Sequence, residues 1–285
     1  MIKKCIRTIF LVSIIAINMF VLAACGSNSE KKASSVDSGQ QSGKSEEKPK
    51  ELTAEETVNK ILQLRKDGKL EEFVNLIWPK YLEIQNVTKE QLINSIKDAD
   101  FKSSFVLKDY RVSAVTDFDK DIKKATVSLK YTDSSGQEKT GEDVFALIKE
   151  DGTWKVSLSG VIDKKDYNYE NITLADGKLS MLLTREIKKV QGSSLRIKVV
   201  NKSNIDFALG WVEGAKAIVD TDKGQFIATI NQGTKIAQGL DDYLNIDVQN
   251  MSGTIKQVKI TSIFALQNGL PNPSDKGIEA VVYKQ

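Results

Sequence analysis

Apolar side chains recur three or four residues apart in three stretches of the chain between residues 53 and 98. This spacing places them along one side of a helix. The first stretch opens with a capping box that starts at Thr53, the third with one that starts at Thr88, and Pro79 ends the second. We therefore expect three short helices, over residues 53–68, 70–78 and 88–98.

After residue 105 apolar and polar positions alternate, which is the pattern of β-strands. Strands are expected over residues 105–115, 125–131, 143–149 and 154–158. The third of these is apolar on both faces, which is typical of an interior strand. Residues 171–285 show seven to nine further short strands separated by turn signals. That arrangement favours a β-sandwich.

The order of these elements resembles known folds in both halves of the chain. Three helices followed by an antiparallel sheet that ends in Asp151-Gly152-x-Trp154-Lys155-Val156 resemble the NTF2-like cone fold of Gram-positive surface lipoproteins. The resemblance implies a sheet curled around a pocket that the helices close, with an Asp or a His–Asp pair in members that are enzymes. The second half resembles immunoglobulin-like modules of bacterial surface lipoproteins, without their Cys-Trp-Cys hallmark. We expect an α+β domain over residues 51–162, a joint over 163–170 and an all-β sandwich over 171–285.

The N-terminal segment has the three parts of a secretory signal. Lys3, Lys4 and Arg7 make a positive start, and an apolar stretch follows as far as Leu22. The closing tetrapeptide Leu22-Ala23-Ala24-Cys25 resembles the bacterial lipobox, which implies that Cys25 is diacylated and becomes the mature N-terminus. We expect residues 1–24 to be removed and the protein to be lipid-anchored on the extracytoplasmic face of the cell membrane. The alternative is an uncleaved transmembrane helix, although the apolar stretch is short for about 30 Å of hydrocarbon.

The segment that follows Cys25 is polar. Between residues 26 and 50 only Ala33 and Val36 have apolar side chains. Such a segment buries too little surface to offset the entropy lost on ordering. We expect residues 25–50 to be a disordered tether with a span of roughly 25–30 Å.

Charge and residue usage exclude several functions. The net charge of +3 disappears with Lys3, Lys4 and Arg7, so the basic pI of 8.6 does not indicate a nucleic-acid partner. The chain has no histidine, which excludes Ser-His-Asp and Cys-His catalysis and His-ligated zinc. Cys5 leaves with the signal and Cys25 is acylated, so no disulfide is expected.

Three short motifs invite a chemical interpretation, and we prefer a structural one for each. Lys139-Thr140-Gly141 matches a penicillin-binding-protein motif, but no Ser-x-x-Lys nucleophile occurs in residues 51–285. The acidic runs 117–121 and 220–222 offer oxygen ligands for calcium, yet neither has both the Gly and the closing Glu of a calcium loop. We expect exposed loops there, and no metal or cofactor.

Two sets of aromatic residues are candidate binding residues. Trp211 lies between Gly210 and Val212 and would anchor a partner if it points outward. The other set would line the pocket of the cone, although the same residues would also fill a helix-on-sheet core. Its members are Trp78, Tyr81, Phe105, Tyr110, Tyr131 and Phe145.

The function expected from these features is non-enzymatic binding by a lipid-anchored accessory protein. Its ligand would be an envelope protein, a wall component or a small molecule, and not nucleic acid. Two alternatives stay open. One is an NTF2-like pocket with residual enzymatic activity from an acid or base other than histidine. The other is a transport solute-binding lipoprotein, which would need helices and strands to alternate along the whole chain.

Overall fold

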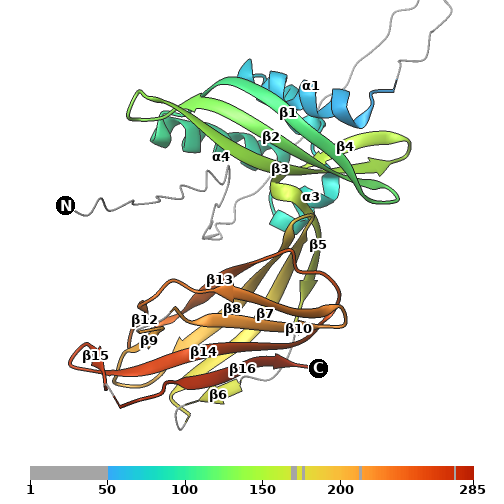
Figure 1. The fold of residues 1–285 in the computed structure, drawn as a ribbon. Helices are drawn as coiled ribbons and strands as arrows, with labels where there is room; N and C mark the ends of the chain where they lie inside the picture. The colour runs from blue at the N-terminus through green and yellow to red at the C-terminus, as the bar shows by residue number, and fades with distance from the viewer. Residues whose placement is uncertain (1–50, 168–171, 175–176, 212–213, 273) are drawn as a thin grey trace, which may run out of the picture.

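The computed structural model describes residues 51–167, 172–174, 177–211, 214–272 and 274–285. The predicted signal segment, Cys25 and the predicted tether lie outside the described residues. The described chain is mostly β, with 54% of it in strands and four α-helices (Figure 1). No described helix is both long and apolar enough to cross a membrane.

The four helices come first. Both predicted capping boxes are present: the Thr53 hydroxyl accepts the N–H of Glu56, and the Thr88 hydroxyl accepts that of Gln91. Each reciprocal pair satisfies two backbone donors at a helix start, which fixes where the helix begins. The helices are α1 (Ala54–Lys66), α2 (Leu70–Asn75), α3 (Pro79–Gln85) and α4 (Lys89–Ser103).

Helix α3 was not expected from the sequence. Pro79 ends the preceding segment, but it also occupies the first turn of α3, where its missing N–H needs no intrahelical partner. The second helix consequently stops at Asn75 instead of continuing to residue 78. The fourth helix runs on to Ser103, five residues beyond the expected end, and Ser104 closes it in the left-handed conformation.

The first sheet has the order β1-β2-β3-β4 and is antiparallel throughout. Its third strand is an interior strand, as its apolar pattern predicted. β1 forms one edge and pairs with β2 through three irregularities in register, which increase the local twist. The strands are β1 (Val106–Asp119), β2 (Ile122–Thr132), β3 (Glu138–Glu150) and β4 (Thr153–Ser157).

The second half contains two antiparallel sheets. One has the order β13-β8-β7-β5 with β6 beside β7, and the other has β11-β10-β14-β9-β12 with β15 and β16 beside β14. There are more strands than expected because four of them have only two or three residues: β9 and β15 pair with β14, β12 pairs with β9, and β6 pairs with β7. The bounds are β5 (Val161–Asp166), β6 (Ile172–Leu174), β7 (Leu179–Lys189), β8 (Gly192–Asn201), β9 (Phe207–Leu209), β10 (Lys216–Thr221), β11 (Gly224–Thr229), β12 (Thr234–Ile236), β13 (Asp241–Gln249), β14 (Ile255–Gln267), β15 (Leu270–Pro271) and β16 (Ile278–Lys284).

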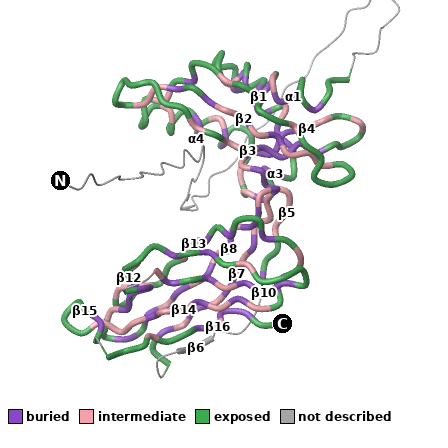
Figure 2. The backbone as a smooth tube through the Cα atoms, viewed as in Figure 1, coloured by how far each residue is buried: buried purple, intermediate pink, exposed green. Residues whose placement is uncertain are grey.

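Two hydrophobic cores result, one in each half of the described chain (Figure 2). The first lies between the helices and the four-stranded sheet, and the second between the two later sheets. Val190 is an exception, because it lies in the β7–β8 turn but packs against the first core. A short 3-10 turn, Leu158–Gly160, leads from β4 into β5, which carries the chain from the first half to the second (Figure 1).

Candidate functional site on the covered face of the first sheet

One face of the first sheet is covered by α1. The hydroxyl of Tyr110 on β1 donates to the backbone oxygen of Asn59 in α1, at 3.2 Å. Leu129 of β2 lies opposite Tyr110, and Val127 follows on the same side of β2. Asp143 of β3 lies opposite Val127. A carboxyl group therefore stands on the covered side of the sheet among apolar side chains.

Asp143 is a carboxyl group of this face whose pKa is raised. It is half-buried, and burial raises its pKa to about 6, although the N–H of Val144 bonds to its Oδ1 at 2.7 Å and acts in the opposite direction. A carboxyl group with a pKa near neutrality exchanges a proton readily at physiological pH. That property suits a general base or acid.

Tyr81 of α3 is a buried phenol whose ionisation is affected by this carboxyl group. It is 3% exposed, and its pKa is raised by burial and further by the negative charge of Asp143. The hydroxyl of Tyr81 consequently stays protonated and remains a hydrogen-bond donor. A proton-accepting carboxylate and a proton-donating phenol thus lie within electrostatic range of each other.

The six aromatic residues predicted to line a pocket all belong to this core. Four are buried, whereas Phe105 and Tyr110 are partly buried against them. Phe105 and Tyr131 stack with ring centroids 5.1 Å apart, and the Arg65 guanidinium lies over the Phe105 ring at 5.5 Å. They are packed as core side chains, so their use as a binding surface stays a prediction.

Four side-chain polar atoms of this unit are buried without a hydrogen-bond partner among the described residues. They are the Nε of Arg65, the indole Nε1 of Trp78 and the hydroxyls of Ser95 and Ser157. An unpaired buried donor costs about 1–3 kcal/mol. Trp78 is also the N-cap residue of α3, so this unpartnered indole N–H lies at the start of the helix that contains Tyr81.

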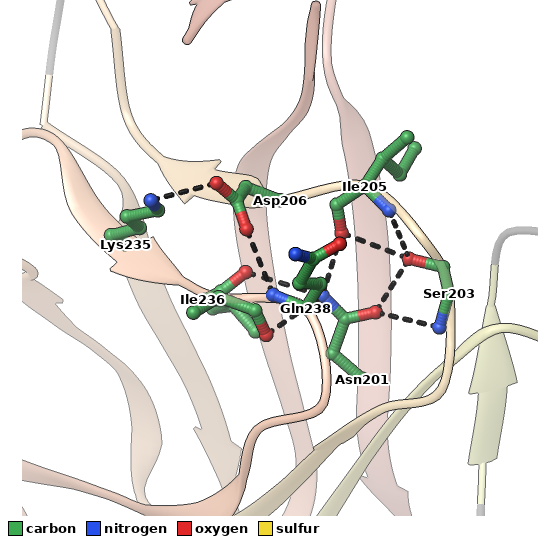
Figure 3. Close-up of polar contacts among 8 residues, drawn as sticks. Asn201, Ser203, Ile205, Asp206, Lys235, Ile236 and Gln238 are labelled. Atoms are coloured by element: carbon green, nitrogen blue, oxygen red, sulfur yellow. Dashed lines mark hydrogen bonds and ion pairs between the residues drawn. The ribbon is translucent and has the colours of Figure 1, made fainter.

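The second unit contains a polar network with a structural role (Figure 3). The side-chain amide of Asn201 donates to the backbone oxygens of Ile205, Ile236 and Ala237 at 2.9–3.2 Å, and its oxygen accepts from Ser203. Every contact of Asn201 is thus with the chain itself. The residue fastens the β8–β9 loop to the segment after β12 and presents no free group to a ligand.

A second buried carboxyl group lies inside the sandwich. Glu186 is 1% exposed and accepts hydrogen bonds from the hydroxyls of Tyr167, at 3.0 Å, and Ser193, at 2.9 Å. The sequence pattern of β7 does not predict that the Glu186 side chain points inward. Leu179, Met181 and Leu183 alternate regularly, but an irregularity between residues 183 and 185 reverses the parity that follows.

The remaining candidates are placed as follows. Trp211 is 39% exposed in the segment between β9 and β10, and its backbone oxygen accepts from the Gln232 side chain. Cys25 lies outside the described residues. Lys139-Thr140-Gly141 falls within β3, and the acidic runs lie at the β1–β2 and β10–β11 hairpins. Within the described ranges, no three Cys, Asp or Glu residues gather as metal ligands would.

Sequence reasoning named Tyr81 but overlooked Asp143. The signal was present, because Asp143 has the same parity along β3 as the buried residues Phe145 and Leu147. A charged residue at an inward position is the informative exception to an apolar pattern. Comparison with known proteins adds nothing to this assignment, since neither a protein-family model nor a curated protein matches the chain.

Proposed function

We propose that the protein is a lipid-anchored binding protein of the extracytoplasmic face of the membrane, and that it acts without catalysis. The observation that carries this proposal is the sequence Leu22-Ala23-Ala24-Cys25 after a charged and apolar leader. Acylation of Cys25 would supply about 0.8 kcal/mol for each buried methylene, and two or more chains give lasting attachment.

In this proposal the tether and the two folded units have different roles. Residues 26–50 set the reach, an NTF2-like unit and an immunoglobulin-like sandwich present the binding surfaces, and confinement near the membrane raises the effective concentration of partners toward the millimolar range. The antiparallel sheets and the early position of all described helices favour this arrangement over a solute-binding protein with two α/β lobes.

Membrane attachment is tested by replacing Cys25 with serine and fractionating the cells. We expect the wild-type protein in the membrane fraction and labelled by a clickable fatty acid, and the Cys25→Ser protein unlabelled. Cys5→Ser is the matched control, since Cys5 precedes the expected cleavage point, and it should behave as wild type. Equal labelling of Cys25→Ser and wild type would refute the lipid anchor.

The partner is sought by crosslinking the anchored protein in intact cells and identifying the attached peptides by mass spectrometry. Reproducible crosslinks from residues 171–285 to one envelope protein would identify an accessory role. Crosslinks that persist unchanged in Cys25→Ser cells would show that anchoring does not determine the partner.

A second function, proton transfer in the first unit, is favoured by one observation. Asp143 has a raised pKa, and its negative charge further raises the pKa of the buried phenol Tyr81. A desolvated carboxylate is a stronger base than one in water. In this alternative Asp143 removes a proton from a bound molecule while Tyr81 or the Trp78 indole donates a hydrogen bond to the developing negative charge.

Nitrobenzisoxazole is a suitable probe, because a desolvated base removes its C–H proton as the N–O bond breaks and a coloured phenolate forms. If the alternative is right, residues 26–285 accelerate this elimination, the rate rises as the pH passes about 6, and Asp143→Asn abolishes it. An unchanged rate in Asp143→Asn would leave Asp143 with a structural role alone.

A further inference from the structure

The solvent face of the sheet β13-β8-β7-β5 has an excess of positive charge. Its outward positions follow from the register, in which Arg196 is opposite Arg185 on one side and Asn245 on the other. Five cationic side chains and three carboxylates stand on this face. They are Lys164, Arg185, Lys189, Arg196 and Lys198, against Asp166, Asp241 and Asp247.

Arg196 is the cation of this face that lacks a carboxylate partner. Within the described part of the chain it takes part in no ion pair, and its Nε is buried without a hydrogen-bond partner. By contrast, Arg185 pairs with Asp166 at 2.6 Å, Lys189 pairs with Asp247 at 3.0 Å, and Lys198 pairs with Asp241. Lys164 also pairs with Asp166, at 3.5 Å, so that carboxylate is shared by two cations, whereas Arg196 pairs with none of the three carboxylates.

An exposed aromatic ring lies directly beside this surplus charge. The guanidinium carbon of Arg196 is 3.8 Å from the centroid of the Tyr243 ring, and the Nζ of Lys198 is 4.9 Å from it. Tyr243 is 40% exposed. Contact with the ring restrains the guanidinium, which limits the directions of its donors before any ligand arrives.

The juxtaposition of Arg185 and Arg196 is unfavourable for the protein alone. The two residues are direct cross-strand neighbours, and like charges in that position repel. Asp166 relieves only Arg185, because it pairs with Arg185 and Lys164 and not with Arg196. A bound anion between the arginines would remove the repulsion that remains.

We propose that this face binds an anionic polymer whose repeating units carry phosphate groups. Guanidinium forks match phosphate oxygens bidentately, and Asn245 adds an amide donor beside Arg196. The cations are spread over three strands spaced about 4.8 Å apart, which fits a chain with repeated charges better than one small anion. The exposed ring of Tyr243 offers an apolar surface to the carbon skeleton between phosphates.

The inference rests on the proposed function in one respect: a protein on the extracytoplasmic face would encounter the polymer outside the membrane. Binding itself is tested in solution with residues 26–285, so its failure is separate from failure of the lipid anchor. The probe is a glycerol phosphate oligomer, measured by calorimetric titration at low and at physiological ionic strength. Inorganic phosphate, phosphatidylglycerol vesicles and uncharged dextran are titrated in parallel.

We expect the oligomer to bind and the affinity to fall as salt is added, because screening weakens exposed charge pairs. Arg196→Gln should lose at least tenfold in affinity, and Tyr243→Ala several-fold. Arg111→Gln is the matched control, since Arg111 is an exposed arginine of β1 in the other unit, and it should bind as wild type. The melting temperature of each variant shows whether the sandwich remains folded, and Arg196→Lys, which keeps the charge but not the fork, should bind with intermediate affinity.

Three outcomes would overturn the proposal. The first is equal affinity of Arg196→Gln and wild type for the oligomer. The second is an equal loss in Arg111→Gln, which would indicate unspecific attraction of a polyanion. The third is binding to the vesicles but not to the oligomer, which would make this face a membrane contact.

Discussion

Asp143 lowers the stability of the folded protein at neutral pH, because burial disfavours its charged form. Its pKa is about 6 in the folded chain, against an ordinary value of 3.8 for an aspartate side chain. The folded state thus binds more protons than the unfolded state between these two values. The contribution of Asp143 to stability is greatest below about pH 4 and is lost as the pH rises through 6.

Replacing Asp143 with asparagine should remove this pH dependence. We expect Asp143→Asn to raise the free energy of unfolding by about 1–3 kcal/mol at pH 7.5 and to change it little at pH 4, as measured by urea unfolding. Asp133→Asn is the opposite case. Hydrogen bonds from Lys139 and Ser135 lower the pKa of Asp133, so this variant should lose stability at neutral pH. A parallel response of the two variants would contradict the assignment.

The side chain of Asn201 alone forms hydrogen bonds to three backbone oxygens. It is 1% exposed, and its loss would leave three backbone oxygens without their donor. We expect Asn201→Ala to lower the free energy of unfolding by about 2–4 kcal/mol. Asn204→Ala, at an exposed position in the same loop, should change it by less than about 0.5 kcal/mol. Similar losses in the two variants would mean that the loop, and not the network, sets the cost.

At the scale of the element, the helix starts were readable because a capping box is a local signal. Thr53 and Thr88 each meet their partner three residues later, with no contribution from the rest of the fold. The interior position of β3 was readable for a similar reason, since its apolar run is continuous. Features that depend on partners distant in sequence were not readable. The reversal of parity before Glu186 arises where β7 pairs with β8, and the nearness of Asp143 to Tyr81 depends on where α3 packs.

The tight turn between β7 and β8 depends on Gly192. Its φ is +136°, and a Cβ there would collide with the backbone oxygen of Val248. Gly224 has a similar φ of +141°, but a Cβ there would meet no other atom. An alanine at Gly224 therefore measures the cost of the backbone conformation without the cost of a collision. We expect Gly192→Ala to lower the free energy of unfolding by at least about 3 kcal/mol and Gly224→Ala by about 1–2 kcal/mol, in chemical denaturation. Equal losses would show that the predicted collision relaxes at no cost.

At the scale of the whole molecule, the two cores meet at a small joint. The N–H of Val190 donates to the backbone oxygen of Gly160 at 2.8 Å, and Lys80 pairs with Asp163 at 3.5 Å. A Cβ at Gly160 would lie 2.5 Å from the Oε1 of Gln191, so the contact is close. Otherwise the two clusters share no member, which makes each core dependent mainly on its own sheet.

Calorimetry of residues 26–285 should therefore resolve two unfolding transitions, and one substitution in each core should assign them. Leu147 and Ile197 are both fully buried, one in each core, and truncation of either to alanine should cost about 2–5 kcal/mol. We expect Leu147→Ala to lower the midpoint of one transition by roughly 10 °C or more and Ile197→Ala to lower the other, each with little effect on its neighbour. Ile227→Ala is the control, because Ile227 is 56% exposed, and it should move neither transition. If both core substitutions instead shift one common transition, the joint at Gly160 and Val190 couples the two halves into a single cooperative unit.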